Sequence, residues 1–436
     1  MTISDGPRQE PYWWEGGTRP TAPPEHPLPK SVDVLVLGAG LTGLSAALTL
    51  ARRGKSVLVL DALAPGEGAS SRNGGMIGGG HRLSIGEMTD RFGHDTALAL
   101  LREAHVASRD YALKLMRDEG IDCDYVETGR FRGLWTASEY EAAGRGLDAL
   151  QRLVDVEAWM VPRTQQRAEA GTDLYAGGTV FARHGGLNPA KWVAGLLAAA
   201  MRAGAMVQGH TPVTALAQDT AGHRVDTPRG RVKAGFVLAA TNGYTDSALP
   251  AARRRIVPIP SYILATEELP AAKMAALFPK GRMVAESRER HCYYRPSPDG
   301  KRVLFGGRAA MFQAPAWFAE DELKRLMEKI FPDLGPVRIS HCWSGRTGFT
   351  FSFLPHVGKL DGVWHAMGYS GSGNAMAPWL GHKAACAILG DADGDTAFRR
   401  TPFPTRAWHR GRPWFLPAAD VMFRARDIVA NFKRAS

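Results

Sequence analysis

A glycine-rich turn between two short apolar runs constrains the fold of this chain more than any other feature. The first run occupies 34–37, the pattern Gly-x-Gly-x-x-Gly follows at 38–43, and a helical stretch leads to a second apolar run at 57–60. Continuous apolar runs of this length are typical of parallel strands that are covered on both faces. The order strand, glycine turn, helix, strand therefore predicts a βαβ unit and an α/β fold.

The same turn predicts a dinucleotide site. Gly38 permits the tight turn, Gly40 lets the main chain approach a pyrophosphate, and Gly43 allows close packing of helix on strand. Unpaired N–H groups at the helix N-terminus favour an anion there. Asp61 ends the second strand, where its carboxylate would accept hydrogen bonds from ribose hydroxyls and disfavour a 2′-phosphate. Cofactor contacts are also expected from the neighbouring Leu41, Thr42 and Ala62.

The fingerprint by itself fits FAD and NAD equally well. A second loop of small residues follows at 68–76, where the chain would return along an extended dinucleotide, and a third glycine-rich passage lies at 368–373. Three such passages, far apart in the sequence, suit one long cofactor that is buried across a domain. This pattern favours FAD.

The order of predicted elements implies two domains with the ligand between them. Helical patterns dominate the first half, whereas the chain after Pro258 is rich in strand patterns and contains a predicted hairpin turn at 298–300. We predict a Rossmann-like FAD-binding domain assembled from discontinuous segments, a substrate domain built on an antiparallel sheet, and two terminal extensions. The segments are 31–95, 165–250 and 345–395 for the FAD-binding domain, 96–164 and 251–344 for the substrate domain, 1–30 for a proline-rich N-terminal arm, and 396–436 for a C-terminal tail.

Composition excludes several classes of protein. With 44% hydrophobic and 22% charged residues, the chain has the balance of a folded globular protein rather than of a disordered one. The net charge is +11, but the basic residues are scattered and follow no phosphate-tracking stripe, so we expect no nucleic-acid partner. Four dispersed cysteines without a CxxC pair predict neither a disulfide framework nor a metal site. We expect a cytoplasmic protein without a secretory signal or a transmembrane segment.

Several motifs together resemble the D-amino-acid oxidase (DAO) superfamily of FAD-dependent oxidoreductases, and within it the gamma-glutamylputrescine oxidase-like branch. These motifs include Gly-Ala-Ser-Ser-Arg-Asn-Gly-Gly at 68–75, Leu-Phe-Gly-Gly-Arg at 304–308, and Gly-Tyr-Ser-Gly-Ser-Gly at 368–373. The resemblance extends from about residue 10 to 390. It implies a flavoenzyme that takes a hydride equivalent from a carbon bearing an amine, after which water hydrolyses the imine to a carbonyl. Oxygen or another acceptor would then reoxidise the flavin.

The resemblance also implies roles for particular residues. Val213 is expected to meet the adenine through its backbone. Gly371, Gly373 and Asn374 are expected to surround the flavin ring near its pyrimidine edge. Residues of the 68–76 loop should approach the flavin side of the cofactor. The full set of cofactor contacts that we expect from these passages is Ser70, Ser71, Arg72, Asn73, Gly74, Gly75, Met76, Val213, Thr241, Asn242, Gly371, Ser372, Gly373 and Asn374.

The sequence departs from sarcosine-oxidase-like members, which carry one lysine just after the last glycines and another before the Gly-Gly turn. The corresponding stretches at 373–376 and 303–306 contain no lysine. This departure argues against a small α-amino acid as substrate and against fast reduction of oxygen. Arg308 remains available to hold a substrate carboxylate through two hydrogen bonds, although a structural salt bridge explains it equally well.

Three further residues are candidates on the substrate side. Tyr293 and Tyr294 are consecutive on a strand, so only one of them faces the cavity, and we take Tyr293 as the catalytic candidate. Trp343 is expected to wall the pocket. Cys342 is considered as a covalent tether for the flavin, although a non-covalent FAD is the preferred prediction and a buried inert thiol the alternative.

We therefore predict an FAD-dependent oxidoreductase that acts on a primary or secondary amine, including one with a distant acidic group. The alternatives are a flavin amino-acid dehydrogenase that passes electrons to a quinone, and a basic nucleic-acid-binding module that merely retains the fold. The tail segment 421–433 mixes apolar and basic residues, so it fits either a helix docked on the body or one with peripheral membrane contact.

Overall fold

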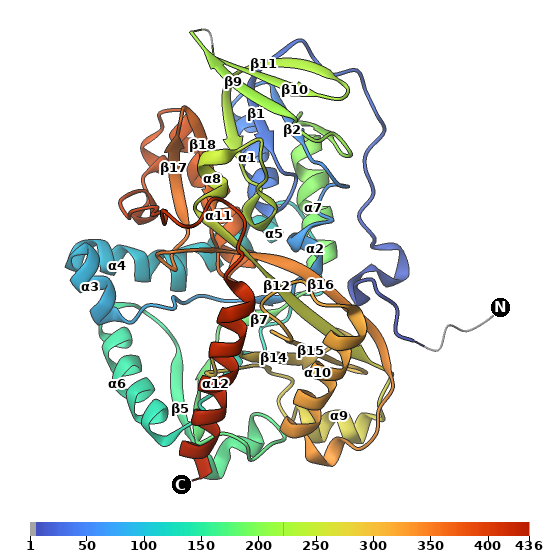
Figure 1. Cartoon of the computed structure of the whole chain (residues 1–436), viewed down its shortest axis with the longest axis vertical. Helices are drawn as coiled ribbons and strands as arrows, with labels where there is room; N and C mark the ends of the chain where they lie inside the picture. The colour runs from blue at the N-terminus through green and yellow to red at the C-terminus, as the bar shows by residue number, and fades with distance from the viewer. Residues whose placement is uncertain (1–5, 221, 436) are drawn as a thin grey trace, which may run out of the picture.

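The computed structural model of the chain describes residues 6–220 and 222–435. Within these residues two eight-stranded sheets form the framework (Figure 1), and the predicted α/β class with a Rossmann-like part is confirmed. The first sheet has the order β17-β18-β11-β1-β2-β8, and β9 and β10 extend it as a hairpin beside β11. Its strands are β1 (Ser31–Leu37), β2 (Val57–Leu60), β8 (Met206–Gln208), β9 (Ala215–Asp219), β10 (Gly222–Thr227), β11 (Gly230–Ala239), β17 (His356–Leu360) and β18 (Val363–Met367).

Both faces of the first sheet are buried, as its apolar runs predict. Along β1, Val34 and Val36 point into a core shared with the helices, whereas Leu35 and Leu37 point into a second cluster on the opposite face. β1 pairs in parallel with β2 and with β11. The helices that cover the first of these faces are α1 (Leu41–Arg52), α4 (His94–Arg102), α5 (Ser108–Asp118), α7 (Pro189–Arg202) and α11 (Gly373–Ile388).

The second sheet has the order β16-β12-β15-β14-β13-β4-β6-β5 and is antiparallel except for the pair β13–β4. Helix α10 (Ala316–Ile330) and the short helix α9 (Ala271–Leu277) pack on one face, around Tyr294, Phe305 and Phe331. The strands are β4 (Arg130–Gly133), β5 (Ala158–Pro162), β6 (Gly177–Phe181), β12 (Ile256–Thr266), β13 (Met283–Glu286), β14 (Cys292–Pro296), β15 (Val303–Gly307) and β16 (Ile339–Thr350).

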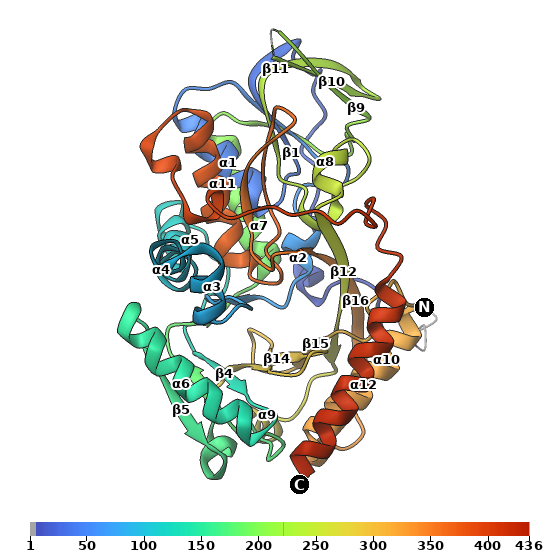
Figure 2. The same cartoon turned by 60° about the vertical axis from the view of Figure 1, so that its left-hand side comes forward.

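Several shorter elements connect the two sheets or lie at their edges. Helix α12 ends the described chain and lies beside α10 (Figure 2). No helix within the described residues is long and apolar enough to cross a membrane. Apart from short 3-10 helices, the remaining elements are α2 (Ala69–Arg72), β3 (Met76–Ile77), α3 (Ile85–Phe92), a short π-helix (Glu103–Ala107), α6 (Ala137–Leu153), β7 (Gly185–Gly186), α8 (Pro250–Arg253) and α12 (Leu416–Ala435).

Two details differ from the sequence prediction. The sequence pattern from Tyr125 to Leu134 is typical of a strand, but only β4 forms there, because Gly129 adopts a positive φ of 78° that interrupts the extended chain. Strand β6 falls inside the segment 165–250, which we assigned to the FAD-binding domain, yet it pairs with β4 and β5 in the second sheet. The division of the chain into domains at the predicted boundaries stays a prediction.

The turn between β1 and α1 has the geometry that its glycines predict. Gly38 has a φ of 101°, a conformation that suits glycine. A Cβ atom on Gly43 would lie only 1.9 Å from the Gly38 carbonyl oxygen. The helix can therefore begin at the end of the strand only because residue 43 has no side chain.

We predict that Gly43→Ala destabilises the folded chain by about 3 kcal/mol, because the added methyl group forces the helix and the turn apart. Gly146 in α6 is the matched control, since a Cβ there meets nothing within 4 Å. Gly146→Ala should raise the free energy of unfolding by about 1 kcal/mol through helix propensity. Guanidinium unfolding of both FAD-saturated variants measures the difference, and equal stability of the two variants would contradict the packing argument.

Candidate functional site

A cavity of about 840 Å³ lies where the carboxyl ends of the parallel strands face the second sheet. Gly38 follows β1, Asp61 follows β2, and Thr241 follows β11, and all three line the cavity. From the second sheet, β12, β14 and β16 contribute the opposite wall. Ligands bind at this edge of open α/β sheets, because the chain reverses there and leaves a crevice.

One end of the cavity has the features of a dinucleotide site. The N-cap of α1, Gly40, supplies no side-chain cap to the first turn of the helix. A Cβ on Gly40 would lie 2.8 Å from Ser70 Oγ, which accepts a hydrogen bond from the Leu41 N–H at 3.1 Å, so the glycine lets Ser70 pack against this turn at the cavity wall. Free N–H groups at a helix N-terminus bind phosphate oxygens well. The arrangement fits the pyrophosphate of FAD.

Asp61 is held in place by two backbone hydrogen bonds. Its Oδ2 accepts from the Ala39 N–H at 2.7 Å, and its Oδ1 accepts from the Leu63 N–H at 2.8 Å. Burial raises the pKa of this carboxyl, and the two backbone hydrogen bonds oppose that effect. Val213, which we expect to meet the adenine, also lines the cavity.

Three tryptophan side chains support loop 71–73 through hydrogen bonds from their indole N–H groups. All three are buried in one cluster with residues of β12 and β15, so the N-terminal arm docks on the body at Trp13 and Trp14. A buried indole N–H seeks an acceptor, and each of these finds one on the same loop. Trp13 Nε1 donates to the Asn73 carbonyl at 2.8 Å, Trp14 Nε1 to Ser71 Oγ at 3.2 Å, and Trp343 Nε1 to the Arg72 carbonyl at 2.8 Å.

A reciprocal pair of amides joins this loop to the last glycine-rich passage. Asn374 Nδ2 donates to Asn73 Oδ1 at 2.8 Å, and Asn73 Nδ2 donates to Asn374 Oδ1 at 3.2 Å. Asn374 also donates to the Met76 carbonyl at 2.9 Å. The contact brings together two predicted cofactor residues that lie 301 positions apart, and it fixes the start of α11 against the loop.

Tyr293 lines the substrate side of the cavity, and Tyr294 lies in the core on the other face of the sheet, as strand alternation predicts. The Tyr293 hydroxyl is 2.9 Å from Ser261 Oγ. Its ring occupies a slot between two glycines, since a Cβ on Gly306 would lie 2.3 Å from it and a Cβ on Gly74 2.7 Å. Burial raises the pKa of Tyr293 to about 12, so the phenol keeps its proton at neutral pH.

Two arginines share one aromatic ring in the cavity wall. The Cζ atoms of Arg308 and Arg82 lie 5.0 and 5.2 Å from the centroid of Phe349. Within the described residues no carboxylate oxygen comes within 4 Å of either guanidinium. Glu289 acts on both from farther away, but its carboxylate pairs with Arg426 at 3.6 Å.

The missing partners leave this wall strongly positive. Burial lowers the pKa of Arg308 to about 9, and the neighbouring charge of Arg82 contributes to the shift. Arginine still carries its charge at neutral pH. Burial together with Arg308 and Arg82 holds the pKa of His291 well below its usual range, so that imidazole is neutral. This part of the wall therefore offers the cations of Arg308 and Arg82 and the neutral ring of His291 to a ligand.

Most of the predicted site residues line this one cavity, and four do not. Gly43 and Gly75 are packed against backbone, Ser71 accepts from Trp14, and Trp343 supports the loop instead of walling the pocket. The predicted residues that line it are Gly38, Gly40, Leu41, Thr42, Asp61, Ala62, Ser70, Arg72, Asn73, Gly74, Met76, Val213, Thr241, Asn242, Tyr293, Arg308, Gly371, Ser372, Gly373 and Asn374. Their roles toward cofactor and substrate stay predictions.

Cys342 is misplaced for a flavin tether. Its side chain is packed in the core between the second sheet and α10, and it is not among the residues that line the cavity. Burial raises the pKa of the thiol to about 12, which makes it an inert group. The structure therefore favours the buried thiol over the tether.

Sequence reasoning missed His291, Arg82 and Phe349. His291 could have been found, because it stands two residues before Tyr293 and alternation places both side chains on the same face. Arg82 and Phe349 carry no such signal. They belong to the cavity only because the loop after β3 and the end of β16 meet there.

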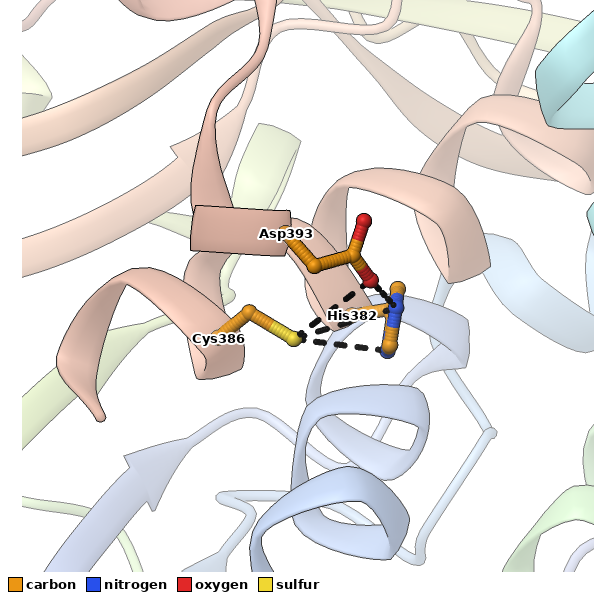
Figure 3. A group of neighbouring side chains, drawn as sticks. All are labelled: His382, Cys386 and Asp393. Carbon is orange, nitrogen blue, oxygen red and sulfur yellow. Dashed lines mark hydrogen bonds and ion pairs between the residues drawn. The ribbon is translucent and has the colours of Figure 1, made fainter. Parts of the chain in front are cut away.

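A group of potential metal ligands lies away from the cavity, at the end of α11 (Figure 3). His382, Cys386 and Asp393 point toward one another, with His382 Nε2 2.8 Å from Asp393 Oδ2. The Lys383 ammonium lies 2.8 Å from the other oxygen of Asp393. Burial raises the pKa of Cys386 to about 11, which disfavours the thiolate that a metal needs. These contacts describe an ion-paired network.

Comparison with known proteins agrees with the site. The family model described as FAD dependent oxidoreductase (DAO) matches residues 33–387. This chain belongs to that family. It is 30% identical over 376 residues to gamma-glutamylputrescine oxidoreductase of Escherichia coli strain K12, a match that covers 85% of this chain and 86% of the relative. It is 32% identical over 382 residues to the probable oxidoreductase OrdL of Rhizobium meliloti strain 1021, covering 87% and 88%.

The fold is also similar to solved structures. Glycine oxidase from Geobacillus kaustophilus superposes with a TM-score of 0.71 at 22% identity, and the match covers 87% of this chain and 99% of that one. The chain is therefore an FAD-dependent oxidoreductase of the DAO family, and the predicted cofactor is confirmed. The residues described above would hold FAD along the cavity, with the pyrophosphate at α1 and the flavin beside loop 71–76.

We predict that Trp343→Phe weakens FAD binding about tenfold, because the buried Arg72 carbonyl loses its donor while the ring volume is nearly kept. Trp317→Phe is the control, since Trp317 is an exposed residue of α10. Titration of each apoprotein with FAD, followed by flavin fluorescence, measures both dissociation constants. Equal affinities for the two variants would show that the loop needs no support from Trp343.

Proposed function

We propose that the chain oxidises the carbon–nitrogen bond of a primary or secondary amine that also carries an acidic group. The observation that supports this most directly is the pair Arg308 and Arg82, which face the cavity over Phe349 without a described carboxylate partner. Arg308 is buried, whereas Arg82 is exposed. A buried cation such as Arg308 is costly without a counter-ion, so the site is suited to an anion that arrives with the substrate. A carboxylate can accept two parallel hydrogen bonds from a guanidinium.

We place the amine end of the substrate beside the uncharged side chains of the cavity wall. His291 and Tyr293 both line it, and their rings are 6.2 Å apart. Neither group is charged at neutral pH; His291 lies near Arg308 and Arg82, and Tyr293 lies near Arg308. Such surroundings disfavour a protonated substrate amine, because desolvation and like charge both oppose the ammonium form. The neutral amine is the form that can be oxidised.

Bound FAD supplies the two-electron oxidation, and the protein supplies orientation and a pocket with little water. Loop 71–76 and the start of α11 fix one wall through the Asn73–Asn374 pair, and Tyr293 fixes the other through Ser261. A substrate held at Arg308 by its acidic end would present its amine to the space between these walls. Fixing both partners in this way removes much of the entropic barrier to reaction.

The electron acceptor is proposed from the sequence around the flavin site. The absence of a lysine at 303–306 and 373–376 favours the dehydrogenase alternative, in which a quinone or another acceptor replaces oxygen. Two assays with the same amine separate the alternatives. Production of hydrogen peroxide at the rate of amine consumption supports an oxidase, whereas turnover only with an artificial quinone supports a dehydrogenase.

We predict that Arg308→Met raises the KM for an amine with a terminal carboxylate about 100-fold, because the charge-assisted hydrogen bonds are lost. The KM for the matched amine that ends in a methyl group should stay within about twofold, since methionine keeps the bulk of the side chain. Steady-state kinetics on the two substrates give both values. An equal rise in KM for both substrates would show that Arg308 does not bind the acidic group.

The same variant makes a prediction about stability. Arg308→Met should melt at the same temperature as the wild type or higher, because a buried charge without a described counter-ion is removed. Adding a dicarboxylate should raise the melting temperature of the wild type and leave that of the variant unchanged. Differential scanning calorimetry of the FAD-loaded proteins measures both. A strongly destabilised variant that still responds to dicarboxylate would contradict this account of the arginine.

A pH profile tests the state of Tyr293. Because burial raises its pKa to about 12, above the ordinary value near 10, the neutral phenol persists in the folded protein across the working range. We expect kcat/KM to rise with pH only as the substrate amine loses its proton. Tyr293→Phe should change the height of this profile but not its midpoint, whereas a shifted midpoint would mean that the phenol itself titrates.

A further inference from the structure

Helix α12 turns polar side chains toward the body and apolar side chains toward solvent. Asp420 is buried, and Arg424 pairs with it at 2.8 Å and with Glu322 of α10 at 3.0 Å. Arg290 adds a further contact to Glu322 at 3.2 Å. This ion-paired network fixes the rotation of the helix on α10, which lies beside it (Figure 2). The charged face holds the helix along α10, and Leu416 and Phe423 pack into an apolar cluster with Phe349.

The opposite face carries an apolar stripe. Val421, Met422, Ile428 and Val429 are between 45% and 68% exposed, and the exposed Ala425 lies between them in sequence. These positions recur at three- and four-residue spacing, so they form one continuous strip along the helix. Solvent-exposed helices normally show the reverse arrangement. An exposed apolar strip of this kind indicates an interaction site for an apolar surface.

Exposed aromatic residues lie at the N-terminal end of this stripe. Trp414 is 69% exposed and Trp408 is 48% exposed, and their rings meet edge to face with centroids 6.3 Å apart. The Trp414 indole N–H donates to the Trp408 carbonyl at 3.3 Å. Tryptophan is enriched where a protein meets the headgroup region of a bilayer, because its ring is apolar and its N–H is polar.

The positive charge of the C-terminal segment favours an anionic partner. Residues 396–436 contain nine basic and two acidic residues, so they carry +7 of the net charge of +11. Arg406, Arg410 and Arg412 alternate with the two tryptophans and are exposed, and among the described residues no carboxylate lies within 4 Å of them. A second copy of this chain would bring the same positive charge to the interface. An anionic surface is electrostatically complementary to it.

We propose that the apolar stripe of α12 and the arginine–tryptophan segment 406–414 dock the enzyme on an anionic lipid bilayer surface. The helix would lie in the plane of the interface, with Val421, Ile428 and their neighbours among the acyl chains and the arginines at the headgroups. The body stays outside the bilayer, in agreement with the lack of a membrane-spanning helix among the described residues. This inference does not depend on the proposed substrate.

Sedimentation with lipid vesicles tests the proposal on the FAD-loaded full chain. We expect the wild type to sediment with vesicles of phosphatidylcholine and phosphatidylglycerol at low salt, and not with phosphatidylcholine alone. Val421→Ser combined with Ile428→Ser should weaken binding at least about tenfold, because two apolar side chains leave the acyl region. Arg410→Gln combined with Arg412→Gln should weaken it by about fivefold for each arginine removed.

Two matched variants serve as controls. Val126→Ser removes an exposed valine elsewhere, and Arg145→Gln with Arg152→Gln removes two exposed charges from α6. Both should bind vesicles as the wild type does, and all variants should retain turnover with a soluble acceptor. The proposal is overturned if the wild type stays in the supernatant with anionic vesicles, or if the α12 variant binds as well as the wild type. It is also overturned if light scattering shows a dimer that the α12 variant separates, since a second copy would then cover the stripe.

Discussion

A contact between two stretches of backbone sets the floor of the cavity on which the rest of the site depends. Helix α1 starts directly at the end of β1 because Gly43 has no side chain to collide with the Gly38 carbonyl. The N-terminus of the helix therefore opens into the crevice at the sheet edge, where its N–H groups favour an anion. Both Asp61 and the loop after α2 reach the same edge, so one cofactor can contact all three.

The opposite wall of the cavity is formed mainly by side chains. The first sheet places backbone groups at the cavity, whereas the second sheet places side chains there, above all Tyr293, His291 and Arg308. Tyr293 is positioned by glycines on both sides of its ring, and Arg308 by the ring of Phe349. Phe349 belongs to the same cluster as Leu416 at the start of α12. The cavity wall and the proposed lipid-facing helix are thus parts of one packed unit.

Most of the cofactor residues predicted from the sequence line one cavity, because that side of the site is encoded locally. The first strand, the glycine turn and Asp61 all lie within residues 31–61. Each residue type there has a steric or electrostatic reason for its position. The substrate side was predicted less completely. Arg82 and Phe349 come from segments far apart in sequence, and Trp343 was assigned to the pocket although its N–H supports the loop at Arg72. Long-range packing determines where these side chains lie, and no local sequence pattern predicts such packing.

A crystal structure of the FAD-loaded enzyme with a bound amine that ends in a carboxylate tests the central claim most directly. The account predicts electron density for the carboxylate within hydrogen-bond distance of Arg308 or Arg82, with the amine-bearing carbon facing the flavin ring beside Tyr293. Density that places the carboxylate elsewhere in the cavity, or the flavin away from loop 71–76, would contradict it.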